Sequence, residues 1–213
     1  MMLIGMFDSP FVRRVAVSMK LLELPFNHAN WSVGKDQVRI REFNPLGRVP
    51  ALVLDDGSVI IESAAILDYL DELAGPDRAL LPASGSARRD ALRLISHAIG
   101  AAEKGRDLIY ERAFRPPDKR YRPWVERCEA QLHGSLRLLE QRCLCAAADT
   151  WMVADRLTQA DITLACAYTF IKETECTGAP LDFCPALQAF VARCESLPEF
   201  RTTYTPWDAP AAG

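Results

Sequence analysis

Residues 44–61 read NPLGRVPALVLDDGSVII, and this stretch decides how the N-terminal part of the chain folds. Two short apolar runs, PALVL at 50–54 and SVII at 58–61, are separated by Asp-Asp-Gly. Because Asp-Gly accommodates the positive φ of a tight turn, the pattern predicts a β-hairpin. Pro50 has no N–H to donate to a ladder, so it suits the start of an edge strand.

Helical patterns flank this hairpin on both sides. Residues 63–75, SAAILDYLDELAG, predict a helix with Ser63 as its cap and Gly75-Pro76 as its stop. Upstream, the sequence predicts, in turn, a strand at 1–7, a helix whose apolar positions run from Phe11 to Leu22, a strand at 25–33 and a polar helix at 37–43. The predicted order over residues 1–76 is therefore β-α-β-α-β-β-α.

The rest of the chain predicts helices only. Residues 77–85 are interpreted as a linker, and 86–213 as an all-helical domain, with helices expected at 86–112, 124–144, 158–174 and 185–196. The segment RPPDKRYRP at 115–123 separates the first two helices. In LTQADITLA, Thr158 and Asp161 have the spacing of a capping box, and Leu157 is placed to pack on Ile162.

Composition limits the class of protein. A hydrophobic content of 49% over 213 residues is enough for a substantial core. With 25 basic and 28 acidic residues the net charge is −3. The sequence has no block of basic residues that could bind along a phosphate backbone, so nucleic acid is not an expected partner. The sequence has no signal-peptide pattern and no apolar run of membrane-spanning length, so we expect no membrane association and a cytoplasmic location.

The cysteines and histidines do not form a recognisable site. All seven cysteines lie from Cys128 onward, and none forms a CxxC pair or a zinc-site spacing. We therefore expect no metal, and interpret the cysteines as small apolar core side chains. His28, His97 and His133 fit neither a dyad nor a metal site and are assigned to structure.

Three pieces of sequence together suggest a family. They are SPFVRRV at 9–15, NPLGRVPAL at 44–52 and ESAAILDYLDE at 62–72, in an α/β region that precedes a helical one. In this order the chain resembles the glutathione S-transferases, bacterial and serine-type, over nearly its whole length. The resemblance implies a thioredoxin-like glutathione-binding domain at 1–76 and an all-helical bundle at 86–213 that carries the second-substrate pocket and dimer contacts. It also implies glutathione as co-substrate and a homodimer.

Glutathione is an extended anionic tripeptide, so its site needs backbone hydrogen bonds along its length and charged groups at its ends. By resemblance, Val49 exchanges main-chain hydrogen bonds with the cysteinyl part of glutathione. The same resemblance implies that Pro50 follows a cis peptide bond, although only about 5–6% of X-Pro bonds in folded proteins are cis.

The ends of glutathione are assigned in the same way. The resemblance implies that Glu62 faces the γ-glutamyl ammonium and that Ser63, at a helix N-terminus, faces the γ-glutamyl carboxylate. Arg48 and Lys35 are candidates for the glycyl carboxylate, with a solvated surface charge as the alternative for Lys35.

Ser9 has two interpretations. Ser at N-cap followed by Pro at N1 is a favoured helix start and needs no chemistry. In the related glutaredoxins a CPxC element follows the first strand, and here the corresponding residues are Ser9-Pro10-Phe11-Val12, so disulfide exchange by paired protein thiols is excluded at this position. The resemblance implies instead that the Ser9 hydroxyl donates to the glutathione sulfur. Asp8, a neighbouring negative charge, would oppose a thiolate unless it points away.

The second-substrate pocket is predicted from aromatic and basic side chains. Plain packing is the alternative for each candidate. Arg13 and Arg14 belong to the first helix, and a solvated face is expected for at least one of them. The candidates for the pocket are Phe7, Phe11, Arg106, Tyr110, Phe114 and Trp207.

The functional hypothesis is a glutathione transferase that adds the glutathione thiolate, stabilised by Ser9, to a small electrophile. Two alternatives stay open. One is a non-catalytic transferase-like binding or regulatory module. The other is a different glutathione-dependent reaction, such as isomerisation, dehalogenation or peroxide reduction.

Overall fold

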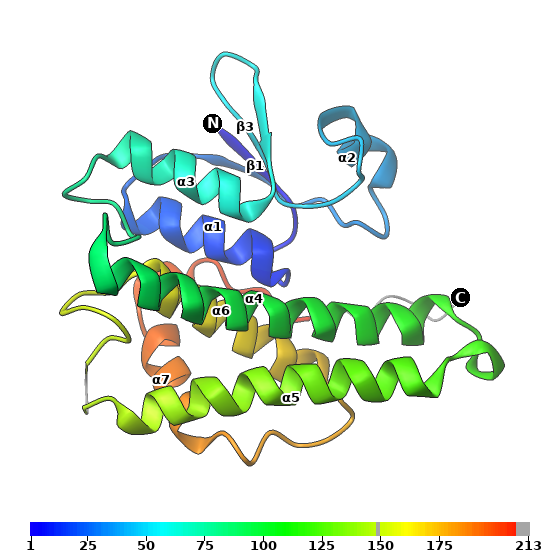
Figure 1. The fold of residues 1–213 in the computed structure, drawn as a ribbon. Helices are drawn as coiled ribbons and strands as arrows, with labels where there is room; N and C mark the ends of the chain where they lie inside the picture. Colours follow the sequence, from blue (N-terminus) through cyan, green and yellow to red (C-terminus); the bar gives the residue numbers. More distant parts are fainter. Residues whose placement is uncertain (148–149, 208–213) are drawn as a thin grey trace.

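The computed structural model describes residues 1–147 and 150–207, and it begins with a small mixed sheet (Figure 1). Its strands are β1 (Met2–Ile4), β2 (Asn27–Ala29), β3 (Ala51–Val53) and β4 (Val59–Ile61), in the order β2-β1-β3-β4. β1 is parallel to β2, whereas the β1–β3 and β3–β4 pairs are antiparallel. The predicted β3–β4 hairpin is confirmed, with Gly57 at φ 85° in its turn.

The two faces of this sheet are covered by different helices. Leu3 and its partner Leu52 belong to the main core with residues of α1 (Pro10–Leu21) and α3 (Ser63–Ala74). The next pair, Ile4 and Ala51, points to the opposite face and packs with Ile40 of α2 (Gln37–Phe43). This alternation follows from the two-residue period of a strand. The predicted order β-α-β-α-β-β-α is confirmed.

The second part of the chain is helical, as predicted. Its elements are α4 (Gly85–Phe114), a 3₁₀ turn η1 (Pro117–Lys119), α5 (Arg122–Cys145), α6 (Gln159–Thr174), α7 (Pro185–Glu195) and α8 (Pro198–Arg201). The sequence prediction missed the short η1 and α8. In Figure 1 the long α4 and α5 run side by side, with α6 behind them. The last six positions of the predicted helical domain, 208–213, lie outside the described residues.

The capping box of α6 is confirmed. The carboxylate of Asp161 accepts hydrogen bonds from the backbone N–H of Thr158 at 2.7 Å and from that of Met152 at 2.8 Å. Burial raises the pKa of Asp161. These bonds satisfy backbone donors that α6 and the segment before it would otherwise bury unpaired.

The contact between α1 and the helical part corrects one expectation. Both Arg13 and Arg14 are 3% exposed, so neither lies on a solvated face. Arg13 donates to both carboxylate oxygens of Glu195, at 2.8 and 2.5 Å, and to the carbonyls of Phe200 and Thr203, at 3.1 Å each. The sequence prediction failed because α1 packs on the sheet and against α6, and α7 and α8 cover Arg13, so charged positions of the helix became interior.

Helices α4 and α6 approach each other closely at Gly105. A Cβ at this position would lie 3.2 Å from the Cys176 sulfur and 3.3 Å from the Phe170 ring. The absence of a side chain therefore lets Phe170 pack directly against the α4 backbone.

The cysteines lie mainly in this core, as predicted. Cys143 is half-buried and Cys145 is exposed. Burial raises the pKa of the Cys166 thiol to about 12, which keeps it protonated and unreactive at neutral pH. The fully buried cysteines are Cys128, Cys166, Cys176, Cys184 and Cys194.

Candidate functional site

A cavity of about 340 Å³ opens between the loops of the small sheet and the helices α4 and α6; we call it the Ser9 cavity. Its sheet-side wall comes from residues 6–11, 33–37 and 46–49, and its helical wall from α4, α6 and the segment after α8. The lining residues are Met6, Asp8, Ser9, Pro10, Phe11, Val33, Gln37, Leu46, Gly47, Arg48, Val49, Arg106, Ile109, Tyr110, Phe114, Phe170 and Trp207.

Ser9 lies at the N-terminus of α1, inside this cavity. It is the N-cap residue and Pro10 is the first helical residue, as predicted. Its side chain nevertheless makes no capping hydrogen bond. The hydroxyl is therefore available to a ligand at the positive end of a 12-residue helix.

The loop before β3 presents main-chain groups to the same cavity. The Val49–Pro50 peptide bond is cis, as the resemblance implied. Among the described residues, neither the N–H nor the carbonyl of Val49 has a hydrogen-bond partner. The preceding carbonyl, of Arg48, accepts instead from the side chain of Asn44 at 2.8 Å, which fixes the loop. Val49 thus offers both a donor and an acceptor to an extended chain.

The junction between β4 and α3 lies beside Arg48. The Arg48 guanidinium and the Glu62 carboxylate are 3.2 Å apart, and both side chains are half exposed. Glu62 has φ 66° and ψ 123°, a conformation that costs an ordinary residue about 1–3 kcal/mol. Ser63 is buried as the first residue of α3. Neither Glu62 nor Ser63 lines the Ser9 cavity directly; Glu62 is connected to it through Arg48.

Two further predicted site residues, Phe7 and Lys35, lie outside the lining of the Ser9 cavity. Phe7 stacks on His28, with ring centroids 3.8 Å apart, and does not line the cavity. A ring nitrogen of His28 lies 2.7 Å from the carbonyl oxygen of Gly5. Phe7 therefore packs on β2, at the loop that follows β1. Lys35 is exposed and does not line the cavity, whereas Gln37 of the same segment does.

The helical wall is apolar and aromatic. Tyr110 and Phe114, one turn apart on α4, meet edge to face with centroids 5.1 Å apart. Phe170 of α6 meets Trp207 in the same manner at 5.9 Å. Arg106 donates to Asp107 at 3.0 Å, which leaves further guanidinium donors beside these rings. The cavity therefore joins a polar half at the sheet to an apolar half at the helices.

Several lining residues were missed by sequence reasoning. Ile109 and Tyr110 follow Arg106 on α4 by three and four residues, so all three share one face of the helix. This helical spacing could have predicted Ile109 as a lining residue. Phe170 belongs to a helix that is buried almost all round, so no periodicity marks its orientation. Gln37 carries a buried Oε1 without a hydrogen-bond partner, and its side chain nitrogen donates to the carbonyl of Gly47 at 3.0 Å.

Metal and membrane features are absent from the part of the chain that the structure describes. No three or more His, Cys, Asp or Glu side chains gather there as metal ligands. None of its helices combines the length and the apolar character needed to cross a membrane.

Comparison with known proteins identifies the family. The model of the glutathione S-transferase N-terminal domain matches residues 3–78, and that of the C-terminal domain matches residues 108–198. The chain is 30% identical to "Glutathione S-transferase GstA" of Escherichia coli O157:H7 over 158 residues, 73% of this chain and 72% of that protein. The chain belongs to the glutathione S-transferase family.

Two further similarities extend over nearly the whole chain. "Maleylacetoacetate isomerase" of Pseudomonas aeruginosa is 28% identical over 207 residues, 93% of each chain. A crystal structure of a glutathione S-transferase from Methylobacterium radiotolerans in complex with glutathione sulfonate aligns with a TM-score of 0.88. That alignment has 26% sequence identity and covers 99% of this chain and 97% of the other.

Proposed function

We propose that the protein binds reduced glutathione in the polar half of the Ser9 cavity and adds the glutathione sulfur to a small electrophile held in the apolar half. The observation that carries this proposal is the Ser9 hydroxyl, which lies at a helix N-terminus without a capping bond. Membership in the family and the glutathione sulfonate complex of the Methylobacterium radiotolerans relative support glutathione as the ligand.

The proposed orientation of glutathione uses the groups described above. Val49 pairs with the cysteinyl backbone, because its main-chain donor and acceptor are both unused among the described residues. Glu62 and Ser63 hold the γ-glutamyl end. Arg48, half exposed beside Glu62, faces the glycyl carboxylate, and Lys35 approaches the same end from its exposed loop.

The energy available to Ser9 is enough for thiolate formation. Lowering the pKa of a thiol by two units from about 8.5 requires about 2.7 kcal/mol. A hydrogen bond to a charged acceptor contributes about 1.5–3 kcal/mol, and a helix N-terminus about 0.3–1 kcal/mol more. Because a less basic thiolate is also a weaker nucleophile, holding the electrophile beside the sulfur contributes at least as much to the rate.

The test is a pH titration of thiolate absorbance in the complex with glutathione. We expect a bound-thiol pKa well below the free value of about 8.5, and Ser9→Ala should raise it by about one to two units. Ser84→Ala is the matched control, because Ser84 is also a helix N-cap without a side-chain bond but lies outside the cavity. An unshifted thiol pKa in the wild-type complex would refute the activation mechanism.

The folding stability of the same variant separates the two interpretations of Ser9. A serine that caps its helix loses about 0.5–2 kcal/mol on replacement by alanine. Ser9 makes no capping bond, so we expect Ser9→Ala to change the free energy of unfolding by less than about 0.5 kcal/mol. A large loss of stability with an unchanged thiol pKa would return Ser9 to a structural role.

Isomerisation of an unsaturated carboxylate is a second candidate reaction. It is favoured by the match along 93% of the chain to a maleylacetoacetate isomerase, and by Arg106, whose remaining donors can hold a carboxylate in the apolar half. Product analysis distinguishes the two reactions: isomerisation regenerates free glutathione, whereas conjugation consumes it. Arg106→Gln should impair isomerisation more than conjugation of an uncharged electrophile.

The proposal includes a homodimer, which is typical of the family. Analytical ultracentrifugation of the purified protein checks this oligomeric state.

A further inference from the structure

The turn between α4 and α5 carries a local excess of positive charge. Residues 111–127, which we call the hairpin tip, contain six basic and three acidic side chains, a net charge of +3 in a chain whose net charge is −3. The other 196 residues therefore carry a net charge of −6. From Arg112 to Trp124 every residue except Ala113 is exposed. In Figure 1 the tip extends beyond the sheet domain, at the end where α4 and α5 meet.

Two of the three acidic residues of the tip are already paired within it. Arg115 lies 2.9 Å from the carboxylate of Glu111, and Arg122 lies 2.7 Å from that of Glu126. The remaining cations face only Asp118 within the tip, so the excess of positive charge comes from them. The basic residues of the tip that have no carboxylate partner among the described residues are Arg112, Lys119, Arg120 and Arg127.

The backbone of the tip is fixed by its own side chains. Arg120 donates to the carbonyls of Arg112 at 2.8 Å and of Arg115 at 3.2 Å. The buried Glu111 accepts from the backbone N–H of Tyr121 at 2.9 Å. The bonds from Arg120 end on neutral carbonyl oxygens, so they hold the loop without neutralising the charge. A partner of this surface therefore meets a preformed one, which lowers the entropy lost on binding.

Large aromatic side chains are exposed among these cations. Phe114 is 67% exposed, Tyr121 64% and Trp124 38%. Aromatic residues and arginine are the residue types enriched in protein interfaces and in the positions that contribute most to binding. Phe114 and Trp124 line an open cavity of about 400 Å³ between α4 and α5, which we call the tip cavity. Rings around a hollow suit a side chain inserted by a partner better than insertion of the tip into a lipid surface.

The polar groups in the tip cavity are engaged within the fold. Asp107 accepts from Lys104 at 2.9 Å and from Arg106 at 3.0 Å. Glu111 is held by Arg115 and by the backbone of Tyr121, as described above. The cavity itself therefore accepts an apolar side chain, whereas the cations around it call for acidic groups outside it. The lining residues are Asp107, Tyr110, Glu111, Phe114, Arg115 and Trp124.

We propose that the hairpin tip binds an acidic segment of a partner protein. An aromatic or long aliphatic side chain of this segment enters the tip cavity, and the carboxylates beside it pair with Lys119 and Arg120. An excess of +3 is small beside the row of phosphate contacts that nucleic-acid binding uses, so the charge favours a peptide. Tyr110 and Phe114 line both the tip cavity and the Ser9 cavity, so the bound segment lies next to the apolar half of the Ser9 cavity. The proposal does not depend on glutathione chemistry.

The experiment titrates the full-length protein into a fluorescein-labelled oligoglutamate peptide with one central Phe, and measures fluorescence anisotropy. We expect saturable binding that weakens as salt is added. The same peptide with Ala in place of Phe should bind about tenfold more weakly, because it leaves the tip cavity empty. An oligolysine peptide with a central Phe should not bind. Equal binding of the acidic and the basic peptide would overturn the proposal.

Matched variants locate the peptide on the protein. Trp124→Ala should weaken binding of the acidic peptide about tenfold, whereas Leu144→Ala, an exposed apolar position near the other end of α5, should have no effect. Lys119→Gln should weaken binding about threefold without changing the tip cavity, whereas Lys172→Gln, at an exposed position of α6, should have no effect. Unchanged affinity in both Trp124→Ala and Lys119→Gln would place the peptide elsewhere and overturn the proposal.

Other occupants of the tip are tested with the same Trp124→Ala variant. The competing probes are oligothymidylate and phosphatidylglycerol vesicles. If either bound more tightly than the acidic peptide and lost affinity in Trp124→Ala, the tip would be a nucleic-acid or lipid surface, and the proposal would be wrong. If Trp124→Ala instead dissociated a dimer in analytical ultracentrifugation, a second copy of the chain would cover the tip, with the same consequence.

Discussion

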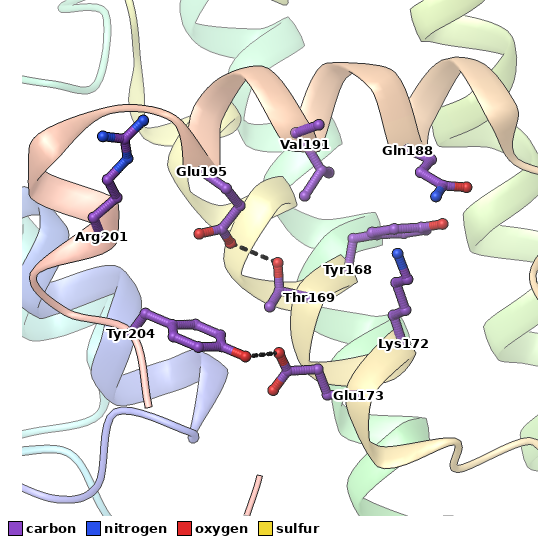
Figure 2. A pocket seen from close by; sticks show the side chains of 10 residues that line it. Tyr168, Thr169, Lys172, Glu173, Gln188, Val191, Glu195, Arg201 and Tyr204 are labelled. Carbon is purple, nitrogen blue, oxygen red and sulfur yellow. Dashed lines mark hydrogen bonds between the residues drawn. The ribbon is translucent and has the colours of Figure 1, made fainter. Parts of the chain in front are cut away.

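A second cavity, of about 540 Å³, lies between α6, α7 and the segment from α8 to Tyr204, on the opposite side of α6 from the Ser9 cavity; we call it the Tyr168 cavity (Figure 2). The two cavities differ in which polar groups are left open. Phe170 lines the first, and its neighbours Tyr168 and Thr169 line the second. The first has an open hydroxyl at a helix end and an open strip of backbone, which suit a peptide thiol. In the second, the carboxylates of Glu195 and Glu173 accept hydrogen bonds from Thr169 and Tyr204 within the wall. The polar groups left open, more than the cavity volume, distinguish the two cavities.

The same short segment after α8 builds part of both cavities. Tyr204 lines the Tyr168 cavity, and Trp207 lines the Ser9 cavity. Both are tied to Glu173 of α6, and the carbonyl of Thr203 is tied to Arg13 of α1. The two cavities therefore differ in chemistry but share one wall. Substitutions at the residues that anchor this wall test whether the two cavities depend on each other.

The largest effect is expected from Arg13→Met. Removing one member of a buried ion pair costs about 3–5 kcal/mol, and the remaining exposure of Glu195, 24%, places this case near 3 kcal/mol. The carbonyls of Phe200 and Thr203 lose their donor as well. Urea unfolding measures the loss. The affinity for S-hexylglutathione should fall as well, because the Trp207 wall of the Ser9 cavity depends on this segment.

A double variant checks the cause. Arg13→Met with Glu195→Met removes both charges, and a buried pair replaced by apolar side chains often costs little. The double variant should therefore be more stable than Arg13→Met alone. If the single variant lost less than about 1 kcal/mol, the ion pair would not be what holds the segment in place.

A smaller and more selective effect is expected from Glu173→Gln. The neutral amide oxygen replaces two carboxylate oxygens, so the bonds from Tyr204 and from the backbone of Trp207 cannot both be kept at full strength. In the proposed orientation the hexyl group lies against the Trp207 wall and glutathione itself does not, so the affinity advantage of S-hexylglutathione over glutathione should fall about tenfold. Calorimetric titration of both ligands measures this ratio.

The control for this variant is Glu175→Gln. It removes the same charge from the exposed C-cap residue of α6, whose carboxylate has no side-chain partner among the described residues. It should leave the ratio unchanged. A fall in the affinity of both ligands by the same factor would mean that Glu173 stabilises the fold as a whole and does not position Trp207 specifically.

The sequence predicted the fold better than the sites, for a physical reason. Turn residues, helix caps and apolar periods are local, so the Asp-Asp-Gly hairpin and the Thr158 capping box could be identified from neighbouring residues. Ser9, Arg48 and Val49, predicted from short motifs of the family, line one cavity, and their roles toward glutathione stay predictions. Phe7 could not, because its contact with His28 joins residues that only the β1–β2 pairing brings together.

The Tyr168 cavity was not predicted at all. Its helix, α6, is buried on nearly every side, so the sequence gives no polar face to interpret. Arg13 shows the same limit from the other direction: its charge suggested solvent, and only packing against α7 and α8 makes it interior. Residues whose role depends on contacts between distant segments are not visible in local patterns.

The smallest effect is expected from substitutions of Glu62, which test whether the backbone beside the Ser9 cavity is strained. The residues of α6 and α7 that line the Tyr168 cavity have ordinary helical backbone, whereas Glu62, beside the Ser9 cavity, has φ 66°. An alanine is strained in that conformation and a glycine is not, so Glu62→Gly should be more stable to urea than Glu62→Ala by about 1 kcal/mol. Both variants lack the carboxylate, so they should lose retention on glutathione resin to the same extent. Equal stability of the two would show that the backbone at this position is unstrained, and retention by both would remove Glu62 from the proposed glutathione site.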